Sequence, residues 1–406
     1  MRLSEVTVHT LSSPIEPSQE RRFHGGVRRL HKRDFVLVRV ETADGEVGYA
    51  PGAATSSAMR EYFDGTAHDD FAELVEGRVR DALAGVDIEA PEDVAETVRD
   101  LGLPTKLESE AIGVIDVAYY DILGKRLGAP VYALLADREV DPDPLELYAS
   151  AGMYMEPEGY AEQARVLRDR GFGAYKYRPG LGVEADERTL RLVREAVGDD
   201  MDVMVDAHTW WKLGDRSYGF EQVVELLDAS GAHDPYWIEE PVEPADYDAY
   251  ERLAERTGLP LAGGESEESV EGLLRLAETG VSYLQGDTRH HAGFTGCWRA
   301  VEACADREDV TFVPHNFGTQ LGLVTNAHLV AASPESPMLE YPVFGEDRGG
   351  MYPFPLAEDV LRDELTVENG TFEVPDGPGL GVEVNENVVE EYPYIEGAWT
   401  EFVYDD

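Results

Sequence analysis

A strand–helix–strand unit occupies residues 174–207, AYKYRPGLGVEADERTLRLVREAVGDDMDVMVDA. Two short apolar runs, AYKYR (174–178) and MDVMVDA (201–207), flank a segment of helical period, ERTLRLVREAV (187–197). Strands separated by helices in this way are typical of a parallel sheet, because a parallel strand can return only through a crossover connection. The number of such units then decides between an open sheet and a closed barrel.

The same alternation continues through residues 141–354. The strand candidates are, in order, LYASA (147–151), AYKYR (174–178), MDVMVDA (201–207), YWIEE (236–240), LPLAGGE (259–265), SYLQGD (282–287), TFVPH (311–315) and MLEY (338–341). Every gap except the last is predicted to hold a helix, such as YAEQARVLRDR (160–170). Eight helix-covered strands favour an α/β fold with a (β/α)8-type barrel, a modified TIM barrel, over an open sheet.

The segments on either side of the barrel have other patterns. Residues 1–140 begin with alternating strand-like runs, VTVHTL (6–11) and FVLVRVETADGEVGYA (35–50), the second of which contains an Ala-Asp-Gly hairpin turn. From residue 55 the period is helical, and one helix has an apolar stripe. The stripe consists of Ile112, Ile115, Ala118, Tyr119 and Ile122. We therefore predict an N-terminal α+β domain ahead of the barrel.

The C-terminal segment, residues 355–406, returns to strands and turns. The strand candidates are LTVENGTFEV (365–374) and GPGLGVEV (377–384). This segment is too short to form a domain of its own, so we expect it to pack back on the N-terminal domain or on the barrel.

The chain carries a large excess of acid. It has 82 Asp and Glu residues against 34 Lys and Arg, a formal net charge of −48. This charge repels polyanions, so nucleic acid is not expected as a partner. The acids are spread along the whole chain and lysine is scarce. This pattern indicates a protein adapted to high salt, where screening weakens self-repulsion.

Neither an export signal nor a membrane span is expected, because no window approaches the length of apolar sequence that either requires. We therefore predict a cytoplasmic protein without membrane contact. The two cysteines, Cys297 and Cys304, lie seven residues apart in a predicted helix and are expected to be buried thiols.

The chain has one basic cluster, RRFHGGVRRLHKR (21–33). It is either a solvated hairpin or a flap that offers positive charge to an anionic ligand. On the second interpretation, Arg21, His24 and Arg29 are candidates for contact with the substrate.

Polar side chains stand at the carboxyl ends of the predicted strands, where barrels place their reactive groups. These residues are Lys176, Arg178, Asp206, His208, Glu239, Glu265, Gln285, Asp287, His315 and Glu340. Charges at the inner ends of apolar strands are costly unless they are paired or bound to metal. Residues two apart on a strand share a face, so both members of Lys176/Arg178 and of Asp206/His208 are expected at the barrel mouth.

Three of these residues form a candidate metal site. Asp206, Glu239 and Glu265 come from adjacent strands and offer only oxygen, which favours Mg²⁺ over Zn²⁺. The alternative is a set of ion pairs. Lys176 is available either for an anionic substrate oxygen or for a salt bridge to one of these carboxylates, and Arg178 stays protonated and is a poor base.

The remaining candidates are acid–base groups. His315 is expected beside Asp287, a carboxylate that would fix its tautomer and raise its basicity. His208 is expected to face His315 from across the pocket.

Taken together, these motifs resemble the mandelate racemase subgroup of the enolase superfamily. The likeness rests on the helix from Ala111 to Lys125 and on the ordered strand ends Lys-x-Arg, Asp-x-His, Glu-Glu-Pro, Gly-Glu, Gln-x-Asp and Pro-His. It implies an N-terminal capping domain, Mg²⁺ on the three carboxylates, a His315–Asp287 dyad as the base, and a homo-oligomer. It also implies that Glu340 hydrogen-bonds a carboxylate oxygen of the substrate.

The sequence differs from the racemases of that subgroup at two positions. Arg178 replaces a lysine that serves as a second base, and His208 stands where many members have asparagine. This pattern resembles the aldonate dehydratases, in which the third-strand histidine is the general acid. We expect a Mg²⁺-dependent dehydratase that converts a sugar acid into a 2-keto-3-deoxy acid. A racemase, epimerase or cycloisomerase, and a non-catalytic barrel that binds an anion, remain the alternatives.

Overall fold

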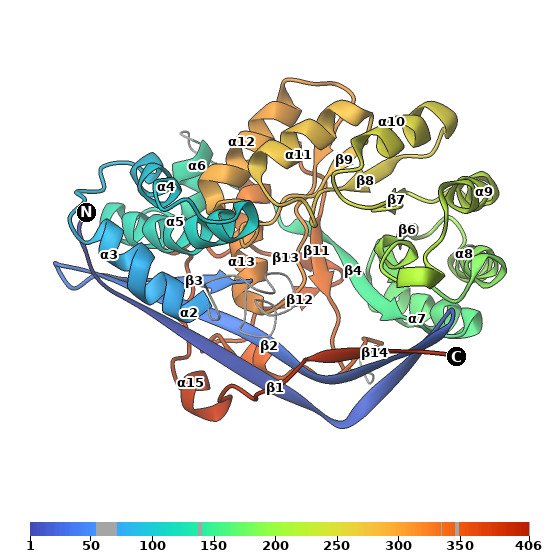
Figure 1. Ribbon diagram of the computed structural model, residues 1–406, viewed down its shortest axis with the longest axis horizontal. Helices are drawn as coiled ribbons and strands as arrows, with labels where there is room; N and C mark the ends of the chain where they lie inside the picture. Colours follow the sequence, from blue (N-terminus) through green and yellow to red (C-terminus); the bar gives the residue numbers. More distant parts are fainter. Residues whose placement is uncertain (54–70, 137–139, 334, 346–348, 406) are drawn as a thin grey trace.

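The computed structural model describes residues 1–53, 71–136, 140–333, 335–345 and 349–405. Figure 1 shows two parts, a helix-rich layer with long strands formed by the N-terminal third and a barrel formed by the remainder. Within the described residues, no helix combines the length and the apolar character needed to cross a membrane.

A four-stranded antiparallel sheet forms the base of the N-terminal domain. Strands β1 (Leu3–Phe23) and β2 (Gly26–Thr42) make a long hairpin, and β3 (Val47–Gly52) pairs with the second half of β2. The predicted turn at residues 43–45 lies between β2 and β3. The last strand of the chain, β14 (Thr400–Tyr404), pairs with residues 26–30 at the start of β2. The C-terminal segment therefore completes the sheet of the N-terminal domain, as Figure 1 shows.

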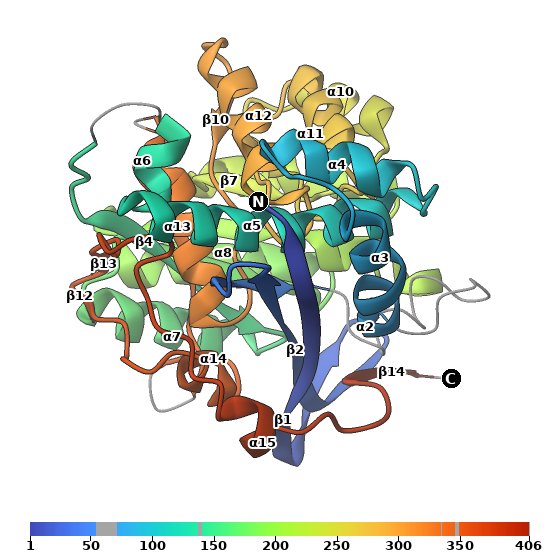
Figure 2. The same ribbon diagram turned by 90° about the vertical axis from the view of Figure 1, so that its left-hand side faces the viewer.

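Helices follow the sheet in this domain. They are α2 (Phe71–Leu74), α3 (Arg80–Leu83), α4 (Pro91–Arg99), α5 (Thr105–Leu127) and α6 (Val131–Ala136), with a π-helical turn, η1 (Val75–Val79), between α2 and α3. Helices α2, α3 and α5 contact the sheet. All five residues of the predicted apolar stripe on α5 are buried. Helix α5 contacts β2, β3 and the barrel helix α12 (Gly293–Ala305), and in Figure 2 it lies between β2 below and α12 above. It is the main bridge from the capping domain to the barrel.

The barrel contains all eight predicted strands. They are β4 (Leu145–Met153), β5 (Ala174–Arg178), β6 (Asp202–Asp206), β7 (Trp237–Glu239), β8 (Leu261–Gly263), β9 (Tyr283–Leu284), β10 (Thr311–Phe312) and β11 (Leu339–Pro342). Consecutive strands from β4 to β10 pair in parallel, and β11 returns to pair in parallel with β4. The fold is a (β/α)8-type barrel with an N-terminal capping domain, as predicted.

The connecting helices are α7 (Pro157–Asp169), α8 (Val183–Val197), α9 (Phe220–Ser230), α10 (Tyr247–Arg256), α11 (Val270–Leu276), α12 (Gly293–Ala305) and α13 (Gln320–Ala332). Helix α13 corrects the prediction that the last gap holds no helix. Every residue of α13 is buried, so the segment has no polar face and no amphipathic period to identify it. The predicted cysteine placement is confirmed, since Cys297 and Cys304 are free, buried thiols on α12.

The C-terminal segment packs on both domains. It contains α14 (Leu356–Asp359), the hairpin β12 (Val367–Glu368) and β13 (Thr371–Phe372), and α15 (Val388–Glu391). Strand β13 pairs with the start of β4 in the barrel, whereas β14 pairs with β2. The predicted strand over 377–384 is wrong. Gly379 and Gly381 have φ of 73° and 69°, a left-handed conformation that ends an extended strand, and only isolated bridges form there.

Candidate active site

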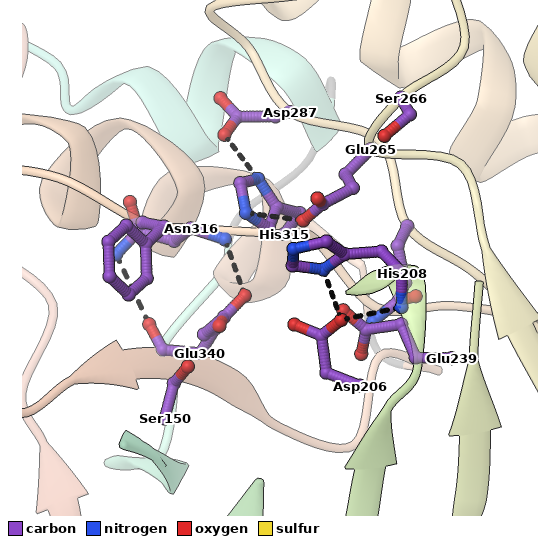
Figure 3. Close-up of polar contacts among 12 residues, drawn as sticks. Ser150, Asp206, His208, Glu239, Glu265, Ser266, Asp287, His315, Asn316 and Glu340 are labelled. Carbon is purple, nitrogen blue, oxygen red and sulfur yellow. Dashed lines mark hydrogen bonds and ion pairs between the residues drawn. The ribbon is translucent and has the colours of Figure 1, made fainter. Parts of the chain in front are cut away.

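Each predicted site residue of the barrel lies at the carboxyl end of its strand. Lys176 and Arg178 are in β5, Asp206 ends β6, Glu239 ends β7 and Glu340 is in β11. The other four follow their strands directly: His208 after β6, Glu265 after β8, Asp287 after β9 and His315 after β10. Because parallel strands end at the same rim, these nine side chains meet in one cluster. Figure 3 labels Asp206, His208, Glu239, Glu265, Asp287, His315 and Glu340 among them.

The cluster has two levels. Arg178, His208, Glu265 and His315 line a cavity of about 290 Å³ between the barrel mouth and the capping domain. The other five are fully buried beneath it and do not line it. They are Lys176, Asp206, Glu239, Asp287 and Glu340. Only the first group is therefore placed to contact a bound molecule directly.

Lys176 forms salt bridges in this structure. Its Nζ lies 2.6 Å from Glu239 Oε1 and 2.9 Å from Glu340 Oε1. Burial alone would lower the pKa of Lys176, but the charges of Glu239 and Glu340 outweigh it and hold the pKa above its usual value. Of the two roles considered for Lys176, the structure shows the salt bridge. In this structure Lys176 holds two carboxylates and does not line the cavity, and its contact with a substrate oxygen stays a prediction.

Glu340 is likewise held below the cavity. It accepts hydrogen bonds at Oε2 from the backbone N–H of Asn316, at 2.9 Å, and from the hydroxyl of Tyr148, at 3.2 Å. Its contacts with Lys176 and its full burial place it away from the lining, so in this arrangement it does not offer an oxygen to a ligand.

Arg178 supplies positive charge at the cavity floor. Its Nε lies 3.1 Å from Asp206 Oδ2, and its Nη1 donates to Ser150 Oγ at 3.3 Å. The guanidinium carbon stacks 4.7 Å from the centre of the Phe317 ring. Burial opposes its charge, but Asp206 and Glu340 raise the pKa of Arg178 above its ordinary value, so it remains a cation.

The predicted His315–Asp287 pair is present. The Nδ1 of His315 lies 2.9 Å from Asp287 Oδ2, while its Nε2 lies 2.7 Å from Glu265 Oε2 (Figure 3). Burial alone would lower the pKa of His315, but the charges of Glu265 and Glu340 and the hydrogen bond to Asp287 raise it to about 10. In this arrangement the ring is an imidazolium at neutral pH.

His208 shares the cavity with His315. Its Nδ1 contacts Asp206 Oδ1, which fixes the ring orientation, and no described residue forms a hydrogen bond with its Nε2. Burial lowers the pKa of His208 below its ordinary value, although Asp206 opposes this effect. The two histidines that the sequence predicted on opposite sides of a pocket therefore both line it.

The three candidate metal ligands lie on neighbouring strands, and Asp206 and Glu239 are register partners across β6 and β7. Among the described residues, no set of three His, Cys, Asp or Glu side chains is already arranged as a metal-binding group. Each carboxylate is instead bound to a cation: Asp206 to Arg178, Glu239 to Lys176 and Glu265 to His315.

The donor chemistry nevertheless fits a hard divalent cation. All three groups offer oxygen, and Asp206 Oδ2 forms an ion pair with Arg178 but is buried without a hydrogen bond. Burial raises the pKa of Glu239 to about 7, against the opposing effect of Lys176. A divalent cation bound to this carboxylate cluster would offset the cost of burying several negative charges. These residues are therefore suited to hold Mg²⁺.

The hairpin residues chosen from the basic cluster do not line the cavity. Arg21 donates to Gln19 Oε1 and to the carbonyl of Met351, His24 is exposed near the hairpin tip, and Arg29 pairs with Glu20. Their neighbours Arg28 and Arg33 line it instead. Alternation along β2 places Arg28 and Arg29 on opposite faces, but it does not place Arg28 and Arg33, five residues apart, on one face, so the sequence pattern could not select this pair.

The sequence analysis did not single out Arg289 and His290, although both stand in the sequence Thr-Arg-His-His (288–291), directly after a predicted strand end. Arg289 Nη2 lies 2.5 Å from Asp287 Oδ2, so Asp287 is shared between Arg289 and His315. His290 lines the cavity and contacts Glu110 of α5 through Nδ1, at 3.2 Å. A run of polar residues after an apolar strand was the available signal.

The sequence profile of the enolase C-terminal domain-like family matches residues 159–388, more than half of the chain. The chain belongs to the enolase superfamily. The profile of the mandelate racemase/muconate lactonizing enzyme N-terminal domain matches residues 7–136, the capping domain. Both domains of this superfamily are therefore present in one chain, in the order that the strand-end motifs predicted.

Several characterised superfamily members are similar over most of their length. D-galactarolactone cycloisomerase of Agrobacterium fabrum is 29% identical, covering 97% of this chain and 99% of that protein. D-xylonate dehydratase of Haloferax volcanii is 29% identical over 71% of this chain and 70% of that protein. Among solved structures, the 3,6-anhydro-D-galactonate cycloisomerase of Zobellia galactanivorans has a TM-score of 0.77 and 27% identity, covering 97% and 99% of the two chains.

Proposed function

We propose that this protein is a Mg²⁺-dependent dehydratase of sugar acids, which removes the proton α to the carboxylate and eliminates the β-hydroxyl. The observation that carries the proposal is that His315 and His208 both line one cavity, with Arg178 at its floor. An elimination needs a group that accepts a proton and another that delivers one, and two imidazoles beside a fixed cation meet that need.

We infer that Asp206, Glu239 and Glu265 would hold Mg²⁺. When bound, the ion would withdraw electron density from the substrate carboxylate and so stabilise the charge that develops as the α-proton leaves. Arg178 adds a second, permanent positive charge on the cavity side of these carboxylates. Lys176 keeps Glu239 and Glu340 in place beneath the cavity.

The base in this proposal is His315. Its Nε2 can accept the α-proton only when that nitrogen is deprotonated and released from Glu265, since Glu265 is the contact that holds a proton there. Asp287 remains on Nδ1, where it fixes the tautomer and stabilises the imidazolium formed. Asp287 is itself fixed by Arg289 and does not need to move.

The acid in this proposal is His208. After loss of the α-proton, the electron pair of the enediolate forms a C=C bond as the β-carbon–oxygen bond breaks. With its Nδ1 held on Asp206, His208 can deliver a proton from Nε2 only as the imidazolium, and that proton converts the departing hydroxyl into water, leaving His208 neutral. The enol product then becomes a 2-keto-3-deoxy acid by tautomerisation. Asp206 holds the opposite nitrogen of His208 and so aims Nε2 away from the barrel core.

A second candidate is a cycloisomerase, which the two cycloisomerases of similar length favour. Opening a lactone or a cyclic ether at the β-carbon breaks the same carbon–oxygen bond after the same proton removal. The leaving oxygen then stays in the product, whose mass is unchanged. A racemase would instead need a base on each face of the α-carbon; Arg178 cannot be one, so His208 would have to serve.

The test is a screen of aldonates, aldarates and their lactones with Mg²⁺, scored for 2-keto acids and for product mass. The net charge of −48 supports running it at high salt. A keto acid that is one water lighter than its substrate supports the dehydratase, whereas an isomeric keto acid supports the cycloisomerase. Ligand binding without any turnover or α-proton exchange would favour the non-catalytic barrel. We further propose that the protein is cytoplasmic and forms a homo-oligomer. Size-exclusion chromatography with light scattering tests the oligomeric state.

A further inference from the structure

Among the charged side chains that line the active-site cavity, cations outnumber acids, in a protein with a strong excess of acid. The cations are Arg28, Arg33, Arg178, Lys212 and Arg289, and the acids are Asp34 and Glu265. Glu265 is occupied by His315. The lining therefore has the opposite sign to the chain as a whole, which points to a ligand with more than one negative charge.

Arg28, on the capping-domain side of the cavity, is one of two arginines that the catalytic proposal does not use. It is only 7% exposed. Its Nε donates to Thr400 Oγ1 at 3.0 Å, and its Nη1 lies 3.6 Å from Met153 Sδ. The rings of Trp399 and Phe402 lie 4.9 and 5.1 Å from its guanidinium carbon. Within the described residues, no carboxylate forms an ion pair with Arg28.

Arg33 is the second of these arginines and lies in a cage of aromatic rings. The centres of the Trp399, Phe317, Tyr352 and Phe354 rings are 4.7 to 6.0 Å from its guanidinium carbon. Its buried Nε has no hydrogen-bond partner. Burial lowers the pKa of Arg33, as expected for a cation that lacks a compensating anion.

The neighbouring carboxylate does not neutralise Arg33. Asp34 Oδ1 lies 3.1 Å from Lys32 Nζ and accepts a hydrogen bond from Ser12 Oγ at 2.7 Å. Lys32 therefore compensates Asp34, and in the part of the chain that the structure describes no ion pair joins Arg33 to an acid. A desolvated, unpaired guanidinium is costly to keep in a cavity unless a ligand supplies the anion.

The ring of Phe317 connects this arginine pair to the part of the cavity that contains the histidines. Phe317 stacks on Arg178, at 4.7 Å, and on Arg33, at 5.3 Å. Phe317 lies two residues after His315 on the loop that follows β10, and both side chains line the cavity. The cavity thus has one cationic group beside the histidines and another on the capping domain, with an apolar ring in contact with both.

We propose that Arg28 and Arg33 bind a second carboxylate, at the end of the substrate remote from the reacting carbon, so that the preferred substrate is a sugar diacid or its monolactone. This inference rests on the proposed function for the identity of the reacting end. Guanidinium groups suit a planar carboxylate, to which they offer paired donors in a fixed fork. A terminal hydroxymethyl group would leave both charges without a partner. Trp399 and Thr400 beside β14 complete the subsite, which gives the C-terminal segment a role in specificity.

The test compares substrates that differ only at the remote end. Galactarate and galactonate, and likewise glucarate and gluconate, differ only in having a carboxylate or a hydroxymethyl group there. Binding is measured by isothermal titration with Mg²⁺ in the His315→Asn background, so that turnover does not enter the result. Substitutions Arg28→Gln and Arg33→Gln are added separately, and Arg22→Gln is the matched control. Arg22 lies on the same hairpin, is exposed, and pairs with the exposed Asp405.

At least one diacid is expected to bind about 10- to 100-fold more tightly than its matched aldonate. Arg28→Gln and Arg33→Gln should each remove most of this preference while leaving aldonate binding in place, which also shows that the variants fold. Arg22→Gln should preserve the preference. The proposal is wrong if no diacid is preferred at least tenfold, or if 6-phosphogluconate binds more tightly than every diacid. A preference in binding without turnover of any sugar acid would support the subsite and refute the proposed reaction.

Discussion

The Nε2 atom of His315 lies 2.7 Å from Oε2 of Glu265, so the proposed base is in contact with a proposed metal ligand. Each group stabilises the charge of the other: Glu265 raises the pKa of His315, and His315 holds the pKa of Glu265 well below its ordinary value. A cation on Glu265 would compete with the proton on His315. Metal binding and the protonation of the base are therefore expected to be linked.

This pair predicts a pH dependence of stability in the metal-free protein. The pKa of His315 is raised from 6.5 to about 10 in the folded state, so its contribution to the free energy of unfolding is fully present below pH 6.5. That contribution is lost as the pH rises through 10. Urea unfolding in EDTA should show wild type more stable than His315→Asn at pH 6, with the gap closing toward pH 10.5. A gap that widens with pH would contradict the assignment.

Magnesium affinity should depend on Asp206. Removing one of three carboxylate ligands is expected to weaken Mg²⁺ binding at least about tenfold, measured by titration calorimetry without substrate. Asp202→Asn is the control, because Asp202 begins the same strand and is exposed at its other end. EDTA should abolish turnover, and added Mg²⁺ should restore it. Equal Mg²⁺ affinity in Asp206→Asn and in the control would remove Asp206 from the metal site.

Lys176 should matter for folding as well as for activity. Lys176→Met leaves Glu239 buried without its lysine and leaves Glu340 with the more distant Arg178, at 3.8 Å, which is expected to cost about 3–5 kcal/mol in the free energy of unfolding. Arg191→Met removes an exposed i, i+4 pair with Glu195 and should change the stability by less than about 0.5 kcal/mol. Urea denaturation of both variants measures the difference. Similar values for the two would show that the buried lysine is not needed to balance these carboxylates.

His208→Asn should separate the two halves of the reaction. Loss of the acid is expected to slow keto acid formation by about 10²- to 10⁴-fold while α-proton exchange continues, because His315 is intact. Keto acid is measured by semicarbazone absorbance, and exchange by NMR of recovered substrate in D₂O. Equal loss of both activities would argue that His208 acts before the carbon–oxygen bond breaks.

The barrel and its strand ends were predictable because both depend on local pattern. Short apolar runs identified all eight strands, and the position of Asp206, Glu239 and His315 at strand ends followed from the shared rim of a parallel barrel. The helix Gln320–Ala332 was missed because it is buried on every side and has no polar face. The strand predicted over 377–384 failed because its glycines adopt left-handed conformations.

The long-range parts of the site were not predictable from one sequence. Lys176 lies on the second barrel strand, as predicted, but its burial beneath the cavity and its pairing with Glu239 and Glu340 depend on depth in the barrel. The basic cluster was recognised, yet the residues that face the cavity are Arg28 and Arg33 rather than Arg21, His24 and Arg29. Which residues of a hairpin contact another domain depends on tertiary packing, and the local sequence pattern does not determine it.

The central claim is that His315 removes the α-proton of a carboxylic acid, and loss of label from the α-carbon tests it most directly. A sugar acid that the screen identifies is deuterated at the α-carbon and incubated with Mg²⁺ and either wild type or His315→Asn, with mass spectrometry of substrate and product. Wild type should release the label, and His315→Asn should release it at least about 10²-fold more slowly. Release at the wild-type rate by His315→Asn would show that another group is the base and would contradict the account.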